Sequence, residues 1–525
     1  MKRKRTTLTA ATVSIALLGT MVAGCSSNQD AKQGASSNAS SNASNNPYVE
    51  LWTVNDQGNK NYEKDGPTSK KMLQDIGVGI YNPLVVWDGG NNYSQKLQTR
   101  IASGDIPDLF VPWKGIESDL AKQGALADLT DLLPKYAPHV YNRIPEDVWK
   151  NVKKSDPTGK GRIYFVPKVT LSNDYGGFIR KDWLDKLGLS IPQTQDEYVN
   201  VLRAFRDKDP NGNGQKDELP LSGREQGRWF DNLFGMYGVA MLEGYPQWDL
   251  YNGEITYSAI TPNMKASLTF LNKLYAEKLL DNNTFLNKSN DWWARITSEK
   301  VGTWFHLGHG LPSTTFGPIS QKNPKLDIAA VPLIKVDGYQ GYITNTRINS
   351  PAWVIANKSE ATTINALKVI DWINDPAHLK ETNFGMKDVN YKEENGKIIP
   401  LNSEKSTVEA ILFPTITDWE GEKILHELTM NSLNDDQKWM EEMKYKALTD
   451  IQSQAKTIAG DGLPASVYDG FTDIKNHTLY QEYMAKIIIG EWPIDKFDEF
   501  VEKWKKTGGD EVTKRVKEWY KQIKQ

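Results

Sequence analysis

Between residues 48 and 111, hydrophobic and polar residues alternate in a way that predicts strands and helices in turn. The run Tyr48-Val-Glu-Leu-Trp52 has the pattern of a half-buried strand and leads into a polar loop at 55–59. The elements predicted after it are a helix at 70–76, a strand at 78–87 around Pro83, a helix at 93–103 and a buried strand at 108–111. This β-α-β-α-β order is typical of a sheet covered by helices, where ligands bind at the carboxyl ends of the strands.

From about residue 162 the pattern becomes mainly helical. A strand at 163–167, a glycine-rich segment at 174–177 and a strand ending at Arg180 predict a crossing into a second lobe. The helices predicted there lie at 181–187, 194–206, 229–241, 261–277 and from about 291, with a strand at 301–305. A strand at 352–355 and a helix at 360–374 are expected to return the chain to the first lobe, and the tail from 435 reads as amphipathic helix.

The N-terminal 46 residues carry the features of secretion. A basic segment at 2–5 precedes roughly 15 mostly apolar residues, which predicts a signal peptide at 1–24. The apolar run is shorter than the ~20 residues that a membrane-spanning helix needs. The sequence Val22-Ala-Gly-Cys25 resembles a bacterial lipobox, which implies acylation of Cys25 and attachment to the outer face of the cell membrane. Residues 25–46, rich in Ser and Asn, predict a flexible tether.

Composition narrows the classes of function. Cys25 is the single cysteine, so disulfides, thiolate metal sites and cysteine nucleophiles are excluded for the remainder of the chain. The net charge of −3 gives no electrostatic footprint for nucleic acid, and about 500 residues predict more than one hydrophobic core. The 17 tryptophans and 22 tyrosines are a supply of flat rings that suit sugars and similar ligands.

One segment predicts a structural calcium site. The run Asp207-Lys-Asp-Pro-Asn-Gly-Asn-Gly-Gln-Lys-Asp-Glu218 matches a twelve-residue calcium loop, with glycine at its sixth position and glutamate at its twelfth. The expected ligands are Asp207, Asp209, Asn211, Asn213 by its carbonyl, Gln215 and Glu218. Because Leu219-Pro220 follows at once, we expect a lone loop without a paired hand, and a solvated polar turn remains the alternative.

Signatures of catalysis are missing from the sequence. There is no G-x-S-x-G, no phosphate-binding loop and no H-E-x-x-H, because His426-Glu427 lacks the second histidine. His306 and His309 lie three residues apart in a glycine-rich stretch, where hydrogen bonding in a loop is favoured over metal binding. No catalytic residue is therefore assigned, although carboxylate pairs of the glycosidase kind cannot be recognised from spacing alone.

Three stretches taken together resemble one family. They are Ala102-Ser-Gly-Asp-Ile-Pro-Asp108, Gly124-Ala-Leu-Ala-Asp-Leu129 and Ile179-Arg-Lys-Asp-Trp-Leu-Asp-Lys-Leu-Gly-Leu189. They are similar to the lipid-anchored extracellular solute-binding proteins of ABC importers in Gram-positive bacteria, of the sugar-binding family 1 type. The loop from Asp209 to Pro220 is similar to the calcium loop of the oligosaccharide-binding branch.

The resemblance implies an α/β fold like that of periplasmic binding proteins, with hinge strands between two lobes and a larger, helix-rich second lobe. The N-terminal lobe is expected to hold 47–172 and about 348–395, and the C-terminal lobe 173–347 and about 396–525. Closure of such lobes around a sugar would make the protein a monomeric receptor that delivers an oligosaccharide to an ABC transporter permease.

The resemblance also implies ligand contacts at polar and aromatic positions. They are Asn55, Asp56, Trp113, Lys114, Tyr175, Trp229, Trp304, His306, His309 and Trp419. Around 171–177 the chain is longer than the maltose-binding pattern and lacks its glutamate, so the sugar is not identified, and Lys114 and Lys168 keep an acidic ligand open. The alternatives are a secreted, calcium-stabilised lyase or glycosidase and a receptor for a peptide or other solute.

Overall fold

The structure is a computed structural model that describes residues 47–53, 62–82, 91–113, 115–172, 175–307, 319, 322–401 and 414–524. Residues 46–525 form one unit, and residues 1–45, with Cys25, form another that lies outside the described residues. Among the described helices, none combines the length and apolar character that a bilayer span requires.

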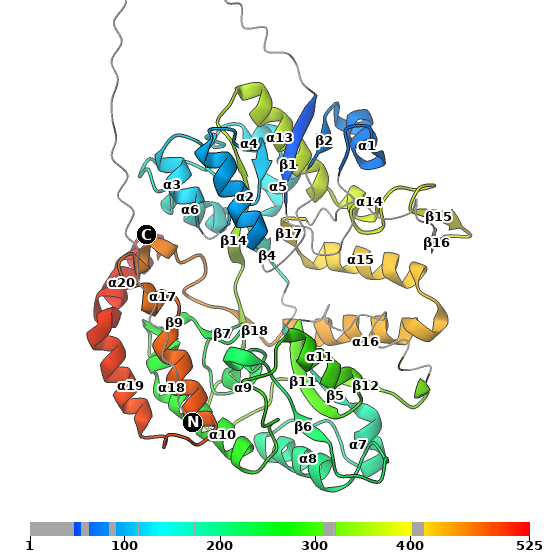
Figure 1. The fold of residues 1–525 in the computed structure, drawn as a ribbon, viewed down its shortest axis with the longest axis vertical. Helices are drawn as coiled ribbons and strands as arrows, with labels where there is room; N and C mark the ends of the chain where they lie inside the picture. Colours follow the sequence, from blue (N-terminus) through cyan, green and yellow to red (C-terminus); the bar gives the residue numbers. More distant parts are fainter. Residues whose placement is uncertain are drawn as a thin grey trace, which may run out of the picture. The chain divides into compact units, whose positions relative to one another are not determined.

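The first sheet has six strands from widely separated parts of the chain (Figure 1). Their spatial order is β17 (Ile416–Thr417), β4 (Val166–Thr170), β14 (Ile348–Ile355), β3 (Leu109–Phe110), β1 (Tyr48–Trp52) and β2 (Gly79–Tyr81). β1 runs parallel to β2 and β3, and β14 runs antiparallel to β3 and β4. The predicted strand at 48–52 is confirmed, and its apolar residues Val49 and Leu51 are buried in the core beneath the sheet.

Helices cover this sheet and bury its apolar side chains. They are α1 (Pro67–Ile76), α2 (Asn91–Ala102), α3 (Glu117–Lys122), α4 (Leu133–Tyr136), α5 (Pro138–Arg143), α6 (Glu146–Lys154) and α13 (Glu360–Asn374). α13 begins at the predicted residue because the Ser359 hydroxyl accepts a hydrogen bond from the Thr362 amide and caps the helix. It packs against α1, α4, α5 and β1, so the chain does return to the first sheet at 348–374.

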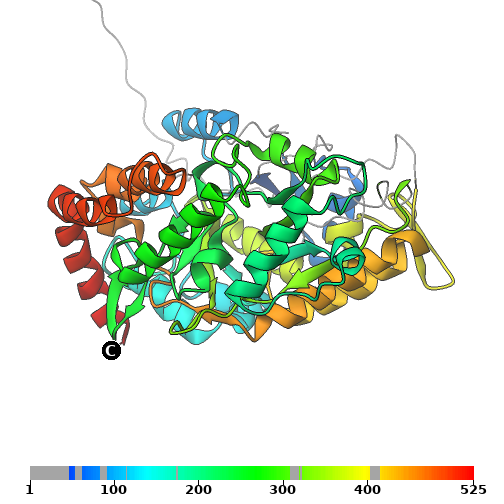
Figure 2. The ribbon, with the colours of Figure 1, turned by 90° about the horizontal axis from the view of Figure 1, so that it is seen from below.

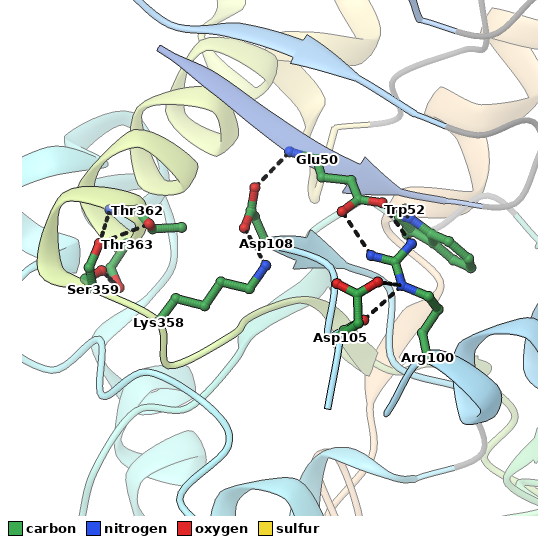
Figure 3. Close-up of polar contacts among 9 residues, drawn as sticks. All are labelled: Glu50, Trp52, Arg100, Asp105, Asp108, Lys358, Ser359, Thr362 and Thr363. Carbon is green, nitrogen blue, oxygen red and sulfur yellow. Dashed lines mark hydrogen bonds and ion pairs between the residues drawn. The ribbon is translucent and has the colours of Figure 1, made fainter. Parts of the chain in front are cut away.

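A polar network joins the edges of β1, β3 and α13 (Figure 3). The Asp108 carboxylate accepts the Glu50 amide at 2.9 Å and the Lys358 ammonium at 2.7 Å. Arg100 of α2 donates to both oxygens of Glu50 at 3.0 Å, and the indole of Trp52 donates to the same carboxylate at 2.9 Å. Asp108, which ends the Ser-Gly-Asp-Ile-Pro-Asp stretch, therefore ties β1 to the segment that leads into α13.

The second sheet has four strands, in the order β12 (Ile328–Val331), β5 (Tyr175–Arg180), β11 (Val301–Leu307) and β6 (Leu219–Leu221). Its helices are α7 (Lys181–Leu187), α8 (Gln195–Asp207), α10 (Pro262–Ala276) and α11 (Ser289–Thr297). A capping box between Thr194 and Glu197 starts α8 as the sequence predicts. The core around this sheet is larger than that around the first.

The other described helices lie mainly in the C-terminal part of the chain. They are α9 (Asp231–Gly235), α14 (Leu379–Phe384), α15 (Trp419–Ser432), α16 (Asp435–Gln452), α17 (Thr472–Lys475), α18 (Thr478–Ile488), α19 (Lys496–Trp504) and α20 (Asp510–Lys524). α16 packs against β5 and β12, while α18 packs against α10 and α19. In Figure 2 the orange α16 and the red C-terminal helices lie on opposite sides of the green segments.

Short strand pairs complete the fold. Three are two-stranded hairpins: β7 (Met241–Leu242) with β8 (Tyr245–Pro246), β9 (Trp248–Tyr251) with β10 (Glu254–Tyr257), and β15 (Tyr391–Glu394) with β16 (Lys397–Pro400). A fourth pair joins β13 (Ile343–Asn345) to β18 (Ala455–Thr457) in parallel.

The helix predicted at 229–241 is wrong. Only Asp231–Gly235 is α-helical, and the chain enters β7 at Met241. Gly238 has φ 73°, and a Cβ there would lie 2.8 Å from the carbonyl oxygen of Gln340. This segment therefore turns sharply against residues 340–342, a tertiary contact that periodicity does not reveal.

The chain passes from β13 to β14 through Arg347, which is held from both sides. The buried Asp461 carboxylate accepts the backbone amides of Arg347 and Ile348 at 2.9 and 3.0 Å and the Arg347 guanidinium at 3.0 Å. The same guanidinium reaches Asp147 of α6 at 2.7 Å. A charged clamp thus fixes one of the crossings between the two sheets.

Candidate functional site

A cleft of about 1250 Å³ is lined by residues of both sheets. The first sheet contributes Lys168, Thr170, Ile416 and Thr417. The segments between the two sheets and the strands beside them contribute Ser172, Tyr175, Thr344, Asn345 and Thr346. The remainder of the second lobe contributes Gln226, Glu243, Tyr245, Gln247 and His477. Most of these side chains end in hydroxyl, amide or charged groups, and the aromatic ones are tyrosines and a histidine. This mixture provides donors and acceptors together with ring faces.

One charged pair on the cleft wall, Arg143 and Asp418, forms bonds within the protein that hold neighbouring elements together. Arg143 of α5 donates to the Asp418 carboxylate at 2.6 and 3.1 Å and to the carbonyl oxygen of Asn374 at 2.5 Å. Asp418 also accepts the Gly421 amide at 2.8 Å and so caps α15. These groups position α15 at the cleft and have little bonding capacity left for a ligand.

Other charged groups on the wall keep their bonding capacity. Among the described residues, Lys168, Glu243 and Lys475 have no ion-pair or hydrogen-bond partner for their side chains, whereas Lys444 pairs with Glu441 at 2.7 Å. Lys168, considered above as a contact for an acidic ligand, does line the cleft. The uncommitted charges are thus of both signs.

His477 lines the cleft in its neutral form. It precedes α18 with φ 54°, and its Nδ1 lies 2.6 Å from the Tyr257 hydroxyl. Its ring contacts those of Tyr245 and Tyr257, with centroids 5.1 and 6.0 Å apart. Burial lowers the pKa of the imidazole to about 4, so at neutral pH it acts as a hydrogen-bonding group without charge.

The predicted aromatic contacts of the second lobe separate into one on the wall and three behind it. Tyr175 lines the cleft, and the Trp229 ring packs behind it with centroids 6.1 Å apart. Trp229 in turn contacts the His306 ring at 4.3 Å. Trp304 is only 1% exposed and belongs to the core of the second sheet, so the structure places it away from the wall.

Of the remaining predicted contacts, the structure describes Trp113 and Trp419, and neither is among the described residues that line the cleft. Trp113 is half-buried after β3 and meets Tyr93 edge to face at 6.2 Å. Trp419 opens α15 beside the lining Asp418 and stacks on Tyr445 at 5.4 Å. Asn55, Asp56, Lys114 and His309 lie outside the described residues, so their roles stay predictions.

The loop after α8 is folded around the Asp209 carboxylate. That carboxylate accepts the amides of Gly212, Asn213 and Gly214 at 3.0 to 3.2 Å. The Asn211 side-chain oxygen shares the Asn213 amide at 2.9 Å, and the Asn213 side-chain oxygen accepts the Gln215 amide at 2.7 Å. Asp207, by contrast, ends α8 and pairs with Arg206 at 2.7 Å.

The oxygen atoms of this loop test its suitability for a cation. Glu218 is buried, and its Oε2 has no hydrogen-bond partner among the described residues. Burial, with Asp209 and Asp217 nearby, raises the pKa of the Glu218 carboxyl. No set of three or more His, Cys, Asp or Glu side chains in the described ranges is arranged to hold a metal, so amide and carbonyl oxygens of the loop would have to complete the site.

Sequence reasoning missed Gln226, Glu243, Tyr245 and His477 on the cleft wall. The first three come from adjacent turns and His477 from a segment more than 200 residues later, so no local motif unites them. The one available signal was Glu243-Gly244 between two short apolar runs, which marks a tight hairpin.

Two lobes built on separate sheets, with a polar cleft lined by both, define the class of solute-binding proteins. Residues 84–379 match the family of bacterial extracellular solute-binding proteins. The chain belongs to this family, which confirms the family and the fold class expected from the sequence.

Each relative named here is less than a third identical to this chain, and LipO and the two solved structures match more than nine-tenths of it. Lipoprotein LipO of Bacillus subtilis is 24% identical over 98% of both chains. The fructooligosaccharide ABC transporter substrate-binding protein FusA of Streptococcus pneumoniae is 30% identical over 46% of each chain. The structure of a FusA EF-hand mutant with fructo-nystose matches 91% of this chain and 99% of that one, with TM-score 0.64 and 19% identity. An extracellular solute-binding protein from Bifidobacterium longum subsp. infantis matches the same shares, with TM-score 0.70 and 19% identity.

Proposed function

We propose that this protein captures an oligosaccharide in the cleft between its lobes and delivers it to an ABC transporter permease. The observation that carries the proposal is the cleft itself. Its volume of about 1250 Å³ exceeds the ~300–1,000 Å³ usual for small-molecule sites, so it has room for several sugar rings. Hydroxyl, amide and charged groups on both sides suit a ligand rich in hydroxyl groups. The naming of FusA as a fructooligosaccharide-binding protein supports this ligand class.

A calorimetric panel tests the proposal. The purified protein is titrated with 1-kestose, stachyose, maltotriose and trigalacturonate, and with a mixture of tripeptides as the non-sugar arm. We expect saturable binding of at least one oligosaccharide and none of the peptides. Binding of peptides alone would show that the ligand is a peptide and not an oligosaccharide. Release of shorter sugars after prolonged incubation would identify an enzyme.

We further propose that Cys25 carries the lipid that holds the protein at the outer face of the membrane. The proposal is supported by the lipobox-like run that ends at Cys25 and by the similarity to a protein named as a lipoprotein. The tether of Ser and Asn residues after Cys25 would leave the lobes free to reach ligand and permease.

We also propose a structural calcium ion in the loop at 209–218, in a register that starts at Asp209. Asp209-Pro-Asn-Gly-Asn-Gly214 fits the first six positions of the calcium-loop pattern, D-x-[DN]-x-[DN]-G, with Glu218 at the tenth position, and the Asp209 carboxylate accepts the loop amides. The side chains of Asp209, Asn211, Asn213, Asp217 and Glu218 and the carbonyl of Gln215 would hold the ion. Asp207, expected above as the first ligand, would then lie outside the site.

A further inference from the structure

Three hairpins of this protein have the same two-residue turn. Each joins its strands through a non-glycine residue and a glycine that both have positive φ: Asn252-Gly253 at 51° and 82°, Asn395-Gly396 at 52° and 77°, and Glu243-Gly244 at 49° and 82°. Positive φ at both positions defines the type I′ turn, for which Asn-Gly is the preferred pair. Two of the three turns follow that preference, and the turn at Glu243 departs from it.

Glutamate is a poor choice for this backbone. The left-handed conformation brings Cβ close to the following carbonyl oxygen and costs roughly 1–2 kcal/mol, while asparagine tolerates it better through local hydrogen bonds. Of the three turns, only that of Glu243 contributes a residue to the cleft as described. The less favourable residue therefore stands at the turn that lines the cleft, and strained residues cluster at functional sites.

The tip of this hairpin is held rigidly. The Gly244 amide donates to the buried Asp231 carboxylate at 3.1 Å. A Cβ on Gly244 would lie 2.9 Å from the carbonyl oxygen of Gln226 and 3.0 Å from the amide nitrogen of Arg228, so the tip packs closely on the neighbouring turn. The Tyr245 hydroxyl donates to Oε1 of Gln226 at 2.8 Å, which ties the next residue to the same turn.

The carboxylate at this fixed tip is uncommitted. The Glu243 side chain is exposed and forms no hydrogen bond or ion pair with any described residue. A carboxylate accepts hydrogen bonds through two oxygens, and bonds to a charged acceptor are stronger than neutral ones. Gln226 also lines the cleft, and because its amide oxygen accepts the Tyr245 hydroxyl, its NH₂ group is available to donate to a ligand.

We propose that Glu243 is a specificity-determining residue whose carboxylate accepts hydrogen bonds from ring hydroxyls of the bound oligosaccharide. Gln226 supplies a donor from the neighbouring turn, and the close packing of the two turns holds both residues in place before the ligand arrives, which lowers the entropic cost of binding. Since Glu243 needs a ligand in the cleft, this role rests on the proposed function.

The turn offers a test that separates binding from stability. The variant Glu243→Asn restores the preferred pair, so its melting temperature should equal or exceed that of the wild type. Its affinity for the best oligosaccharide of the panel, 1-kestose, stachyose, maltotriose or trigalacturonate, should fall about tenfold or more, as expected for loss of a hydrogen bond to a charged group. Glu243→Gln keeps the size of the side chain and removes the charge, and it should lose affinity with little change in melting.

The matched control is Asn252→Glu, which places glutamate in the same turn away from the cleft. It should lower the melting temperature and leave the affinity unchanged. Native affinity in both Glu243→Asn and Glu243→Gln would overturn the role of Glu243 and leave the proposed function standing. If the wild type binds no sugar of the panel, the proposed function fails and the role of Glu243 falls with it.

Discussion

At the scale of single residues, burial controls the ionisation of His477 on the cleft wall. The pKa of its imidazole is lowered to about 4 from the ordinary 6.5. Between these two values the unfolded chain binds a proton at this position that the folded chain does not. Acidification through that window therefore favours unfolding, and the stability contributed by neutral His477 is complete only above about pH 6.5.

We predict that His477→Gln flattens the pH dependence of stability between about pH 4 and 6.5. Each pH unit in this window changes the unfolding free energy by up to ~1.4 kcal/mol through this one group. Urea denaturation at several pH values would measure the difference between variant and wild type. Tyr257→Phe is the control, because it keeps the ring that packs on His477 and burial lowers the pKa of the imidazole, so its slope should stay close to that of the wild type. An equal slope in His477→Gln would contradict the prediction.

At the scale of elements, local sequence signals decided how well boundaries could be predicted. The helices at 181–187 and 360–374 have the predicted bounds, since Gly188 ends the first and Ser359 caps the second. The predicted strand at 78–87 corresponds to β2, which ends at Tyr81, and residues 83–90 lie outside the described residues. The helix predicted at 229–241 failed because its glycines serve tertiary contacts.

The site was less predictable than the fold for a physical reason. Glu243 and His477 contribute to one wall only because hairpin β7–β8 and the start of α18 meet in space. The aromatic residues selected from the sequence were large and apolar. Trp229 and Trp304 are therefore buried in the core behind the wall. Tyr175 was found because its strand begins at a crossing between sheets.

The proposed calcium loop leads to a prediction about which residue is its first ligand. Adding calcium should raise the melting temperature of the wild type, and a chelator should reverse the change, because a ligand of the native state stabilises it by ~2.7 kcal/mol at 100 times its dissociation constant. Asp209→Asn and Glu218→Gln should each weaken this response. Asp207→Asn should keep it, since Asp207 pairs with Arg206. Differential scanning calorimetry with and without calcium measures the change in melting temperature. Loss of this change in Asp207→Asn would favour the register that starts at Asp207.

At the scale of the whole molecule, membrane attachment and ligand binding should be independent. We predict that Cys25→Ala releases the protein into the medium with its oligosaccharide affinity unchanged, because the sequence predicts a flexible tether at 25–46 between the proposed lipid site and the residues that line the cleft. Fractionation of cells followed by calorimetry on the released protein measures both properties. Membrane retention of the variant would show that another feature anchors the chain.

The position of β17 in the first sheet has a consequence for how the protein matures. Its residues 416–417 pair with β4 in the sheet whose first strand begins at Tyr48, so this sheet is complete only after about 370 intervening residues have been made. Such distant pairings make folding slow and leave hydrophobic strands uncovered in the meantime. The first sheet of a newly made chain therefore stays incomplete until β17 pairs with β4, whereas the strands of the second sheet all lie between residues 175 and 331 and can pair earlier.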